Sequence, residues 1–166
     1  MKQLWAPWRM TFLEDTHEKK QEGCIFCTLV QEKADEKNLI VHRAERVFVI
    51  LNKYPYNNGH VMVIPFQHTN RLEDLSKETL GDLMLWSRHC QAALDEAYQP
   101  QGFNLGMNLG TAGGAGIKDH LHMHIVPRWV GDTNFLPVLA DTKSMPQHLS
   151  ESFESIQKYF GRLKSP

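Results

Sequence analysis

Three histidines alternate with apolar residues in the last third of the chain. His120, His122 and His124 are separated by Leu121 and Met123, and a glycine-rich segment precedes them. Because alternate side chains of a strand point to the same face, the three imidazoles would share one face, about 7 Å apart along the strand. Each ring has two nitrogens that need hydrogen bonds or a metal, so burial of the three rings without such partners would be costly. Two chemistries are open: a three-histidine metal site that activates water, or a nucleophilic imidazole with polar neighbours.

Two cysteines form a second pattern that could carry chemistry. Cys24 and Cys27 have the spacing with which two thiolates hold one zinc ion, and tetrahedral zinc then takes two more ligands. The candidates are His68 and His120; if His120 binds zinc, the other two histidines of the triplet remain available for catalysis. A thioredoxin-like redox motif is the alternative, but it requires the cysteines at the start of a helix in a parallel α/β fold, which this chain does not predict.

The elements that must position these residues are mainly strands. Five segments are rich in β-branched and aromatic residues and are bounded by turn residues. They are residues 38–43, 46–52, 60–65, 102–108 and 120–127. Strands that are interrupted by a helix, without a repeating βαβ pattern, predict an antiparallel α+β domain.

Two helices complete the predicted fold. The first begins after Ser76, a good N-cap, ends before Pro100, and has apolar residues at a spacing of three and four. We expect Leu80, Leu83, Met84, Ser87/Cys90, Leu94 and Tyr98 to form its buried face. The second helix carries the pattern from Leu149 to Leu163 and is expected to start at Pro146. His42 and His148 are interpreted as solvated side chains.

The composition limits the classes of protein that remain. A chain of 166 residues is near the usual size of one domain, and its 42% apolar and 22% charged residues are typical of a globular protein. A net charge of -1 without a basic block argues against binding of long nucleic acids. We recognise neither a membrane span nor a signal peptide, so a cytoplasmic location without membrane attachment is expected.

The residues that could carry chemistry resemble the histidine-triad (HIT) superfamily. Its motif, three histidines separated by apolar residues and followed by two more apolar residues, is matched by residues 120–126, HLHMHIV. The resemblance extends to CIFC at 24–27, to Asn52 placed eight positions before His60, to VIPFQH and to PRW. LWAPWR, LNKYPYNNGH, GFNLGMN and GDTNFLPV are similar to the bacterial diadenosine tetraphosphate (Ap4A) phosphorylase branch of that family.

The resemblance implies a HIT-like fold, a five-stranded antiparallel sheet with a long central helix and a C-terminal helix, that assembles as a homodimer. It divides the chain into an N-terminal extension (1–22), which carries Trp5 and Trp8, a HIT domain (23–140) and a C-terminal helical tail (141–166). It also implies structural zinc at the cysteines and their partner histidines.

The resemblance further implies roles at the catalytic site. His122 would attack the α-phosphate of a dinucleoside polyphosphate and form a nucleotidyl-histidine, and His60 would lie beside it. The implied nucleotide contacts are Asn52 at the ribose, Asn108 near the phosphates, and His124 with the backbone of Gly116, Ile117 and Lys118 at the phosphate oxygens. Many family members have Gly-Gln-Ser/Thr-Val before the triad, whereas this chain has Gly-Ile-Lys-Asp, so Lys118 could replace the missing polar groups.

Chemical reasoning adds one expectation about His122. A histidine nucleophile must be neutral at the attacking nitrogen, and its other ring nitrogen should donate to a backbone carbonyl. Water or inorganic phosphate could then attack the intermediate, so hydrolysis and phosphorolysis both stay open. Two alternatives also remain: a nucleoside phosphoramidase, and a non-catalytic zinc module that binds nucleotides.

Overall fold

The sheet is the framework of the molecule. A computed structural model describes residues 23–133 and 144–163; the predicted N-terminal extension with Trp5 and Trp8 lies outside the described residues. In the described part of the chain, five strands form one antiparallel sheet in the order β1-β2-β3-β5-β4. The strands are β1 (Ile40–Arg43), β2 (Val47–Leu51), β3 (Val61–Pro65), β4 (Gly102–Gly106) and β5 (Met123–Arg128). The predicted α+β fold with a five-stranded antiparallel sheet is confirmed.

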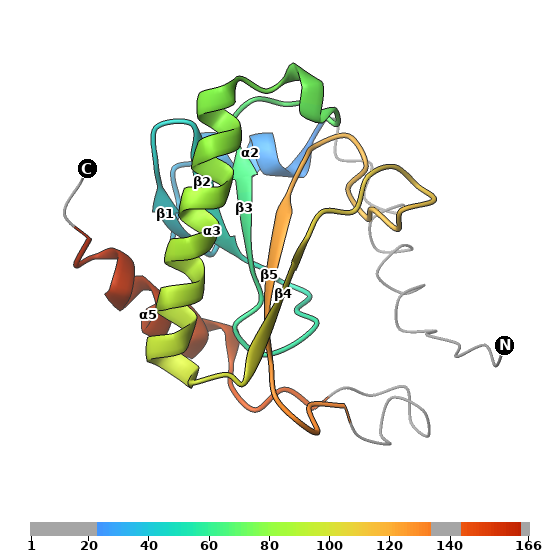
Figure 1. The fold of residues 1–166 in the computed structure, drawn as a ribbon. Helices are drawn as coiled ribbons and strands as arrows, with labels where there is room; N and C mark the ends of the chain where they lie inside the picture. Colours follow the sequence, from blue (N-terminus) through green and yellow to red (C-terminus); the bar gives the residue numbers. More distant parts are fainter. Residues whose placement is uncertain (1–22, 134–143, 164–166) are drawn as a thin grey trace, which may run out of the picture.

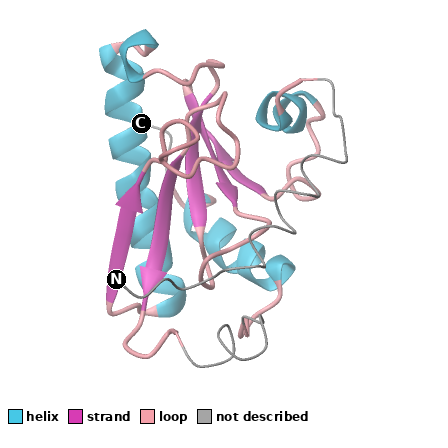
Figure 2. Ribbon diagram, turned by 90° about the vertical axis from the view of Figure 1, so that its right-hand side faces the viewer, coloured by secondary structure: helices cyan, strands magenta, loops and turns pink. Residues whose placement is uncertain are grey.

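The two faces of the sheet pack against different helices. Figure 1 shows the long helix α3 (Lys77–Tyr98) across one face, and Figure 2 shows the sheet between α3 and the short helix α2 (Ile25–Gln31). The larger core lies under α3 and α5 (Leu149–Phe160), and the valines of β2 and β3 contribute to it. A smaller core on the opposite face joins Phe26 of α2 to side chains of β1, β2 and β3. No helix of the described part is long and apolar enough to cross a membrane.

Helix α3 begins where the sequence predicts, and its buried face coincides only in part with the predicted one. The Ser76 side chain caps it by accepting a hydrogen bond from the Thr79 backbone N–H at 3.1 Å. The expectation that Leu80 and Met84 are buried is wrong, because these side chains are 37% and 58% exposed. Leu83, Cys90 and Leu94 are buried as expected. Ser87 is buried as well, and its hydroxyl donates to the Leu83 carbonyl oxygen at 2.6 Å. Trp86 and Ala93 are buried too, so the buried face is rotated about the helix axis, away from Leu80 and Met84.

Helix α5 is built into the main core. It contributes three buried side chains, those of Phe153, Ile156 and Phe160. The helix begins at Leu149 rather than at Pro146, because the His148 side chain caps it by accepting from the Ser150 backbone N–H.

The interpretation of His42 as a solvated side chain is also wrong. Its ring is stacked between Trp86 of α3, with ring centroids 4.3 Å apart, and Phe160 of α5, at 5.3 Å. Burial lowers the pKa of His42 below its ordinary value, and repulsion from His89 lowers it further. The burial of His42 depends on α5 packing against β1, and the sequence does not show this contact.

Candidate active site and zinc site

The CxxC segment and two histidines from distant parts of the chain form one cluster. Cys24 occupies the N-cap position of α2 and Cys27 lies in the first turn of this helix, which the sequence does not predict. The helix therefore presents both sulfurs on one side. His68 follows β3, and His120 precedes β5. One ligand atom from each of the four residues lies within 4.8 Å of the other three. All four residues that the sequence analysis selected for zinc are therefore brought together.

The distances in this cluster suit tetrahedral zinc. Zinc binds sulfur at about 2.3 Å and imidazole nitrogen at about 2.0–2.1 Å, so its ligand atoms lie about 3.3–3.8 Å apart. The His120 Nδ1 is 3.2 Å from the Cys24 Sγ and 3.7 Å from the Cys27 Sγ. The His68 Nδ1 is 3.6 Å from the Cys27 Sγ and 3.3 Å from the His120 Nδ1. No two of the four ligand atoms are more than 4.8 Å apart, so the residues present fit the ion with movements of about 1 Å or less.

A backbone carbonyl orients His120 toward the cluster. The His120 Nε2 lies 2.8 Å from the carbonyl oxygen of Pro65, which can only accept a hydrogen bond. The proton is therefore on Nε2, and the lone pair on Nδ1 points at the cysteine sulfurs. A second-sphere bond of this kind fixes the tautomer that a metal ligand needs.

The orientation of His122 is set by the residue two positions before it. Its Nδ1 lies 2.8 Å from the His120 carbonyl oxygen, so Nδ1–H is the donor and the lone pair is on Nε2. His122 is 5% exposed and its ring packs on Phe26, with centroids 5.4 Å apart. Burial lowers its pKa, and the bond to the His120 carbonyl offsets part of this effect. The hydrogen bond expected from chemical reasoning is present, and it leaves a neutral ring with a lone pair on Nε2.

A chain of hydrogen bonds fixes the protons on His60 and His124. The Tyr56 backbone N–H, which can only donate, is 3.0 Å from the His60 Nδ1. The His60 proton is therefore on Nε2, which lies 2.9 Å from the His124 Nδ1. His124 must accept that bond, so its own proton is on Nε2.

The Nε2–H of His124 has no hydrogen-bond partner within the described residues. Among the described residues, no other buried side-chain nitrogen or oxygen lacks a partner. His124 as a whole is 9% exposed. Burial, and then repulsion from His122, lower the pKa of His124 to about 4, so the ring is neutral near pH 7. The His122 and His124 ring centroids are 4.8 Å apart. A lone pair that can attack and a donor that can bind an oxygen therefore stand side by side.

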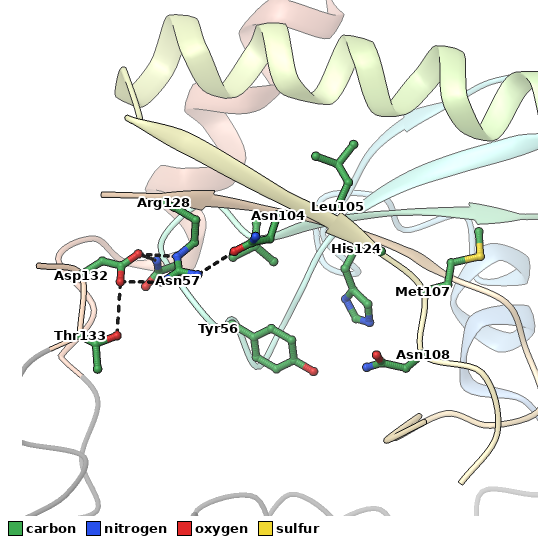
Figure 3. Close-up of a pocket in the computed structure, with 12 residues that line it drawn as sticks. Tyr56, Asn57, Asn104, Leu105, Met107, Asn108, His124, Arg128, Asp132 and Thr133 are labelled. Atoms are coloured by element: carbon green, nitrogen blue, oxygen red, sulfur yellow. Dashed lines mark hydrogen bonds and ion pairs between the residues drawn. The ribbon is translucent and has the colours of Figure 1, made fainter. Parts of the chain in front are cut away.

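Of the remaining predicted site residues, some lie near His60 and His124 and others are exposed. Asn52 directly follows β2, and its Nδ2 is 3.2 Å from the His60 Nδ1. Asn108 lines a pocket together with His124, as Figure 3 shows. In the glycine-rich turn, Gly116 and Lys118 are exposed, whereas Ile117 packs on the smaller core beside Phe26.

Two residues of the site have no predicted role. Tyr56, whose backbone N–H orients His60, lies inside LNKYPYNNGH, where the sequence assigns roles to Asn52 and His60 alone. Phe26 lies between the two cysteines, and its ring contacts both His120 and His122. The only sequence signal for either residue was its position. Tyr56 lies between the motif residues Asn52 and His60, and Phe26 lies between the paired cysteines.

Comparisons with known proteins agree with this geometry. A family model described as HIT domain matches residues 33–130. AP-4-A phosphorylase of Mycobacterium tuberculosis is 36% identical over 157 residues, which cover 92% of this chain and 80% of that protein. The asymmetrical bis(5'-nucleosyl)-tetraphosphatase of Schizosaccharomyces pombe is 31% identical over 93 residues, 56% of this chain and 50% of that protein.

Solved structures of similar proteins have the same fold. A zinc-bound histidine triad family protein from Mycobacterium smegmatis superimposes with a TM-score of 0.68 and 26% sequence identity. The match covers 84% of this chain and 94% of that chain.

Proposed function

The chain belongs to the histidine-triad (HIT) domain family, and from this premise we propose that it cleaves dinucleoside polyphosphates such as Ap4A by transferring a nucleotidyl group to His122. The observation that carries the proposal is the pair of buried, neutral rings with fixed protons. His122 offers a lone pair on Nε2, and His124 offers an N–H that is otherwise unpartnered. The names of the M. tuberculosis and S. pombe relatives support the substrate class.

The first step transfers AMP to the enzyme. The His122 Nε2 attacks the α-phosphorus of Ap4A; an N–P bond forms, the bond from that phosphorus to the bridging oxygen breaks, and ATP leaves. No proton has to be removed, because the attacking nitrogen carries none. The positive charge that develops on the ring is stabilised through Nδ1–H by the His120 carbonyl oxygen. The His124 Nε2–H donates to a phosphate oxygen, a preorganised donor where negative charge accumulates.

The second step releases the AMP group from His122. Attack of inorganic phosphate on the α-phosphorus gives ADP, attack of water gives AMP, and each breaks the N–P bond and restores the neutral ring. The phosphorylase name of the M. tuberculosis relative, which matches 92% of this chain, supports phosphorolysis. The tetraphosphatase name of the S. pombe relative, matched over 56% of the chain, supports hydrolysis.

The test is product analysis combined with trapping of the intermediate. Purified protein is incubated with Ap4A, with and without phosphate, and the nucleotides are separated by chromatography. ADP and ATP formed only with phosphate identify a phosphorylase; AMP and ATP formed without it identify an asymmetric hydrolase. With radiolabelled Ap4A and rapid denaturation, one AMP per chain should stay bound to wild type and none to His122→Asn. Cleavage by His122→Asn at the wild-type rate would refute the mechanism.

Failure to cleave Ap4A would leave two other functions. Release of AMP from adenosine 5'-phosphoramidate would indicate a nucleoside phosphoramidase. Binding of AMP without turnover of either compound would indicate a nucleotide-binding zinc module.

The zinc ion is the second part of the proposal. We expect the thiolates of Cys24 and Cys27 and the Nδ1 atoms of His68 and His120 to hold it, and it would serve to fix the start of β5. The zinc-bound M. smegmatis relative supports this assignment. Elemental analysis of the protein, purified without chelators, should give one zinc ion per chain.

A homodimer is the third part. Strand β4 is at an edge of the sheet and ends the strand order, and edge strands usually need to be covered. Leu105 on β4 is 44% exposed, and Leu80 and Met84 expose apolar surface on α3. Light scattering with size-exclusion chromatography should give twice the mass of the chain, and Met84→Lys should shift the protein toward monomer.

A further inference from the structure

A pocket extends from His124 along the outer half of the sheet. Its volume is about 370 Å³, within the range of roughly 300–1,000 Å³ of small-molecule sites. Strand register pairs Gly106 with His124 and Asn104 with Val126, so all four residues are on the same sheet face. The pocket therefore lies on the face that carries the catalytic ring, over β4 and β5, as Figure 3 shows.

The far wall of this pocket is polar but nearly neutral. The Arg128 guanidinium donates two hydrogen bonds to the Asp132 carboxylate, at 2.6 and 3.0 Å, and one to the Asn104 Oδ1 at 2.6 Å. Asn57 donates to the same carboxylate at 2.6 Å and to the Pro127 carbonyl oxygen at 3.1 Å. The positive charge is thus balanced inside the wall, and the side chains are held rigidly. Such a wall suits a neutral group that makes hydrogen bonds better than it suits a phosphate.

An aromatic ring forms another side of the pocket. The Tyr56 ring packs on His60 and His124, with centroids at 4.7 and 5.7 Å, and the residue is 39% exposed. Val126 contributes apolar surface to the lining. An exposed aromatic ring beside apolar surface is the kind of platform on which a nucleobase stacks.

The position of the pocket relates it to the reaction. Asn52 follows β2, whereas the pocket lies over β4, and these strands are on opposite sides of the β3–β5 pair that carries the catalytic histidines. At a strand spacing of about 4.8 Å, β2 and β4 are about 14 Å apart. The unpartnered Nε2–H of His124 is between the two sides. A substrate with a nucleoside at each end of a phosphate chain could therefore span the site.

We propose that this pocket binds the second nucleoside of the dinucleoside polyphosphate, the one that departs with the leaving group. The inference rests on the proposed function and adds to it a recognition site for the half of the substrate that is not attacked. Enzymes use contacts to remote parts of a substrate to lower the barrier at the reacting centre, so loss of these contacts should lower kcat/KM.

The test compares two substrates that present the same α-phosphate. Ap4A has the second nucleoside, and adenosine 5'-tetraphosphate lacks it; both release a polyphosphate from the same attacked phosphorus. Wild type should have a kcat/KM about tenfold higher for Ap4A, since stacking of one base contributes about this factor or more. Gly106→Leu places a side chain in the pocket from a strand position where an added Cβ meets nothing within 4 Å. It should lower the ratio of the two kcat/KM values to near one.

The matched control is Gly81→Leu, the same substitution at a glycine of α3 whose Cβ also meets nothing within 4 Å. It should keep the wild-type ratio. A wild-type ratio near one, or a ratio that Gly106→Leu does not change, would overturn the subsite while leaving the proposed function intact. Absence of cleavage of both substrates by wild type would instead overturn the proposed function, and the subsite with it.

Discussion

Gly59 lies in the loop that carries the site residues Asn52, Tyr56 and His60. We expect Gly59→Ala to be strongly destabilising. Its φ is +74°, in the region that residues with a Cβ rarely adopt, and an added Cβ would lie 2.8 Å from the Leu94 Cδ2 and 2.8 Å from the Tyr98 Cε2. The left-handed backbone costs about 1–2 kcal/mol. Overpacking of a filled core costs about 1–3 kcal/mol more, and Leu94 is fully buried, so it has little room to move. Together these effects should lower the free energy of unfolding by about 2–5 kcal/mol.

Two other glycines separate the contributions. Gly131 has a φ of +81° but open space around its Cβ, and Gly102 has open space and no positive φ. Gly131→Ala should therefore show the backbone cost alone, about 1–2 kcal/mol, and Gly102→Ala should be close to neutral. Urea denaturation of the three variants and wild type, with equal m-values required, gives the comparison. If Gly59→Ala were no more destabilising than Gly131→Ala, the packing argument for this loop would be refuted.

Three further predictions test the metal, the proton chain and the buried histidine. Cys27→Ser should lose the bound zinc and several kcal/mol of stability, whereas Cys90→Ala, at a buried cysteine outside the cluster, should keep the metal; elemental analysis and thermal unfolding decide. His60→Gln should lower kcat about 100-fold or more with a smaller change in KM, because the His124 donor loses the bond that fixes its proton; an unchanged kcat would contradict this role. The folded pKa of His42 is lowered, so its proton binds more tightly to the unfolded chain and stability should fall as the pH drops below about 6.5. His42→Phe keeps the ring stack and should make the loss of stability between about pH 7 and pH 5 smaller, and an unchanged slope would exclude His42 as its source.

The sequence was most informative where local pattern and fold agree. The enrichment in β-branched and aromatic residues predicted all five strands. The alternation of the histidine segment is also seen, since His120 and His122 lie on the Phe26 side while Leu121 and Ile125 enter the larger core. Strand β5 nevertheless begins at Met123, three residues later than expected, because His120 turns toward the cysteine cluster and Leu121 donates its backbone N–H to Thr69 rather than to a neighbouring strand. Such a departure depends on residues far away in the chain and could not be seen in the local pattern.

Other parts of the site were not predictable because long-range packing determines them. The short helix α2 has no long apolar period; it places Phe26 in the smaller core and both sulfurs near His120. The order of protons along Tyr56, His60 and His124 follows from one backbone N–H whose position is known only from the folded loop. The far wall of the pocket joins Asn57, Asn104 and Asp132, which nothing in the sequence connects.

The histidines occupy every second position, and this spacing explains how one short segment can supply both a metal ligand and a nucleophile. The His120 ring faces the cysteines through Nδ1, while its backbone carbonyl accepts the proton of the His122 Nδ1. The same residue thus connects the zinc site to the orientation of the attacking ring, and disturbance of the cluster should reach His122 through a single carbonyl group. His124, two residues further on, stays on the same face and meets His60. Insertion of one residue between His122 and His124 would turn the following side chains to the opposite face. The nucleophile would then be separated from the hydrogen-bond donor.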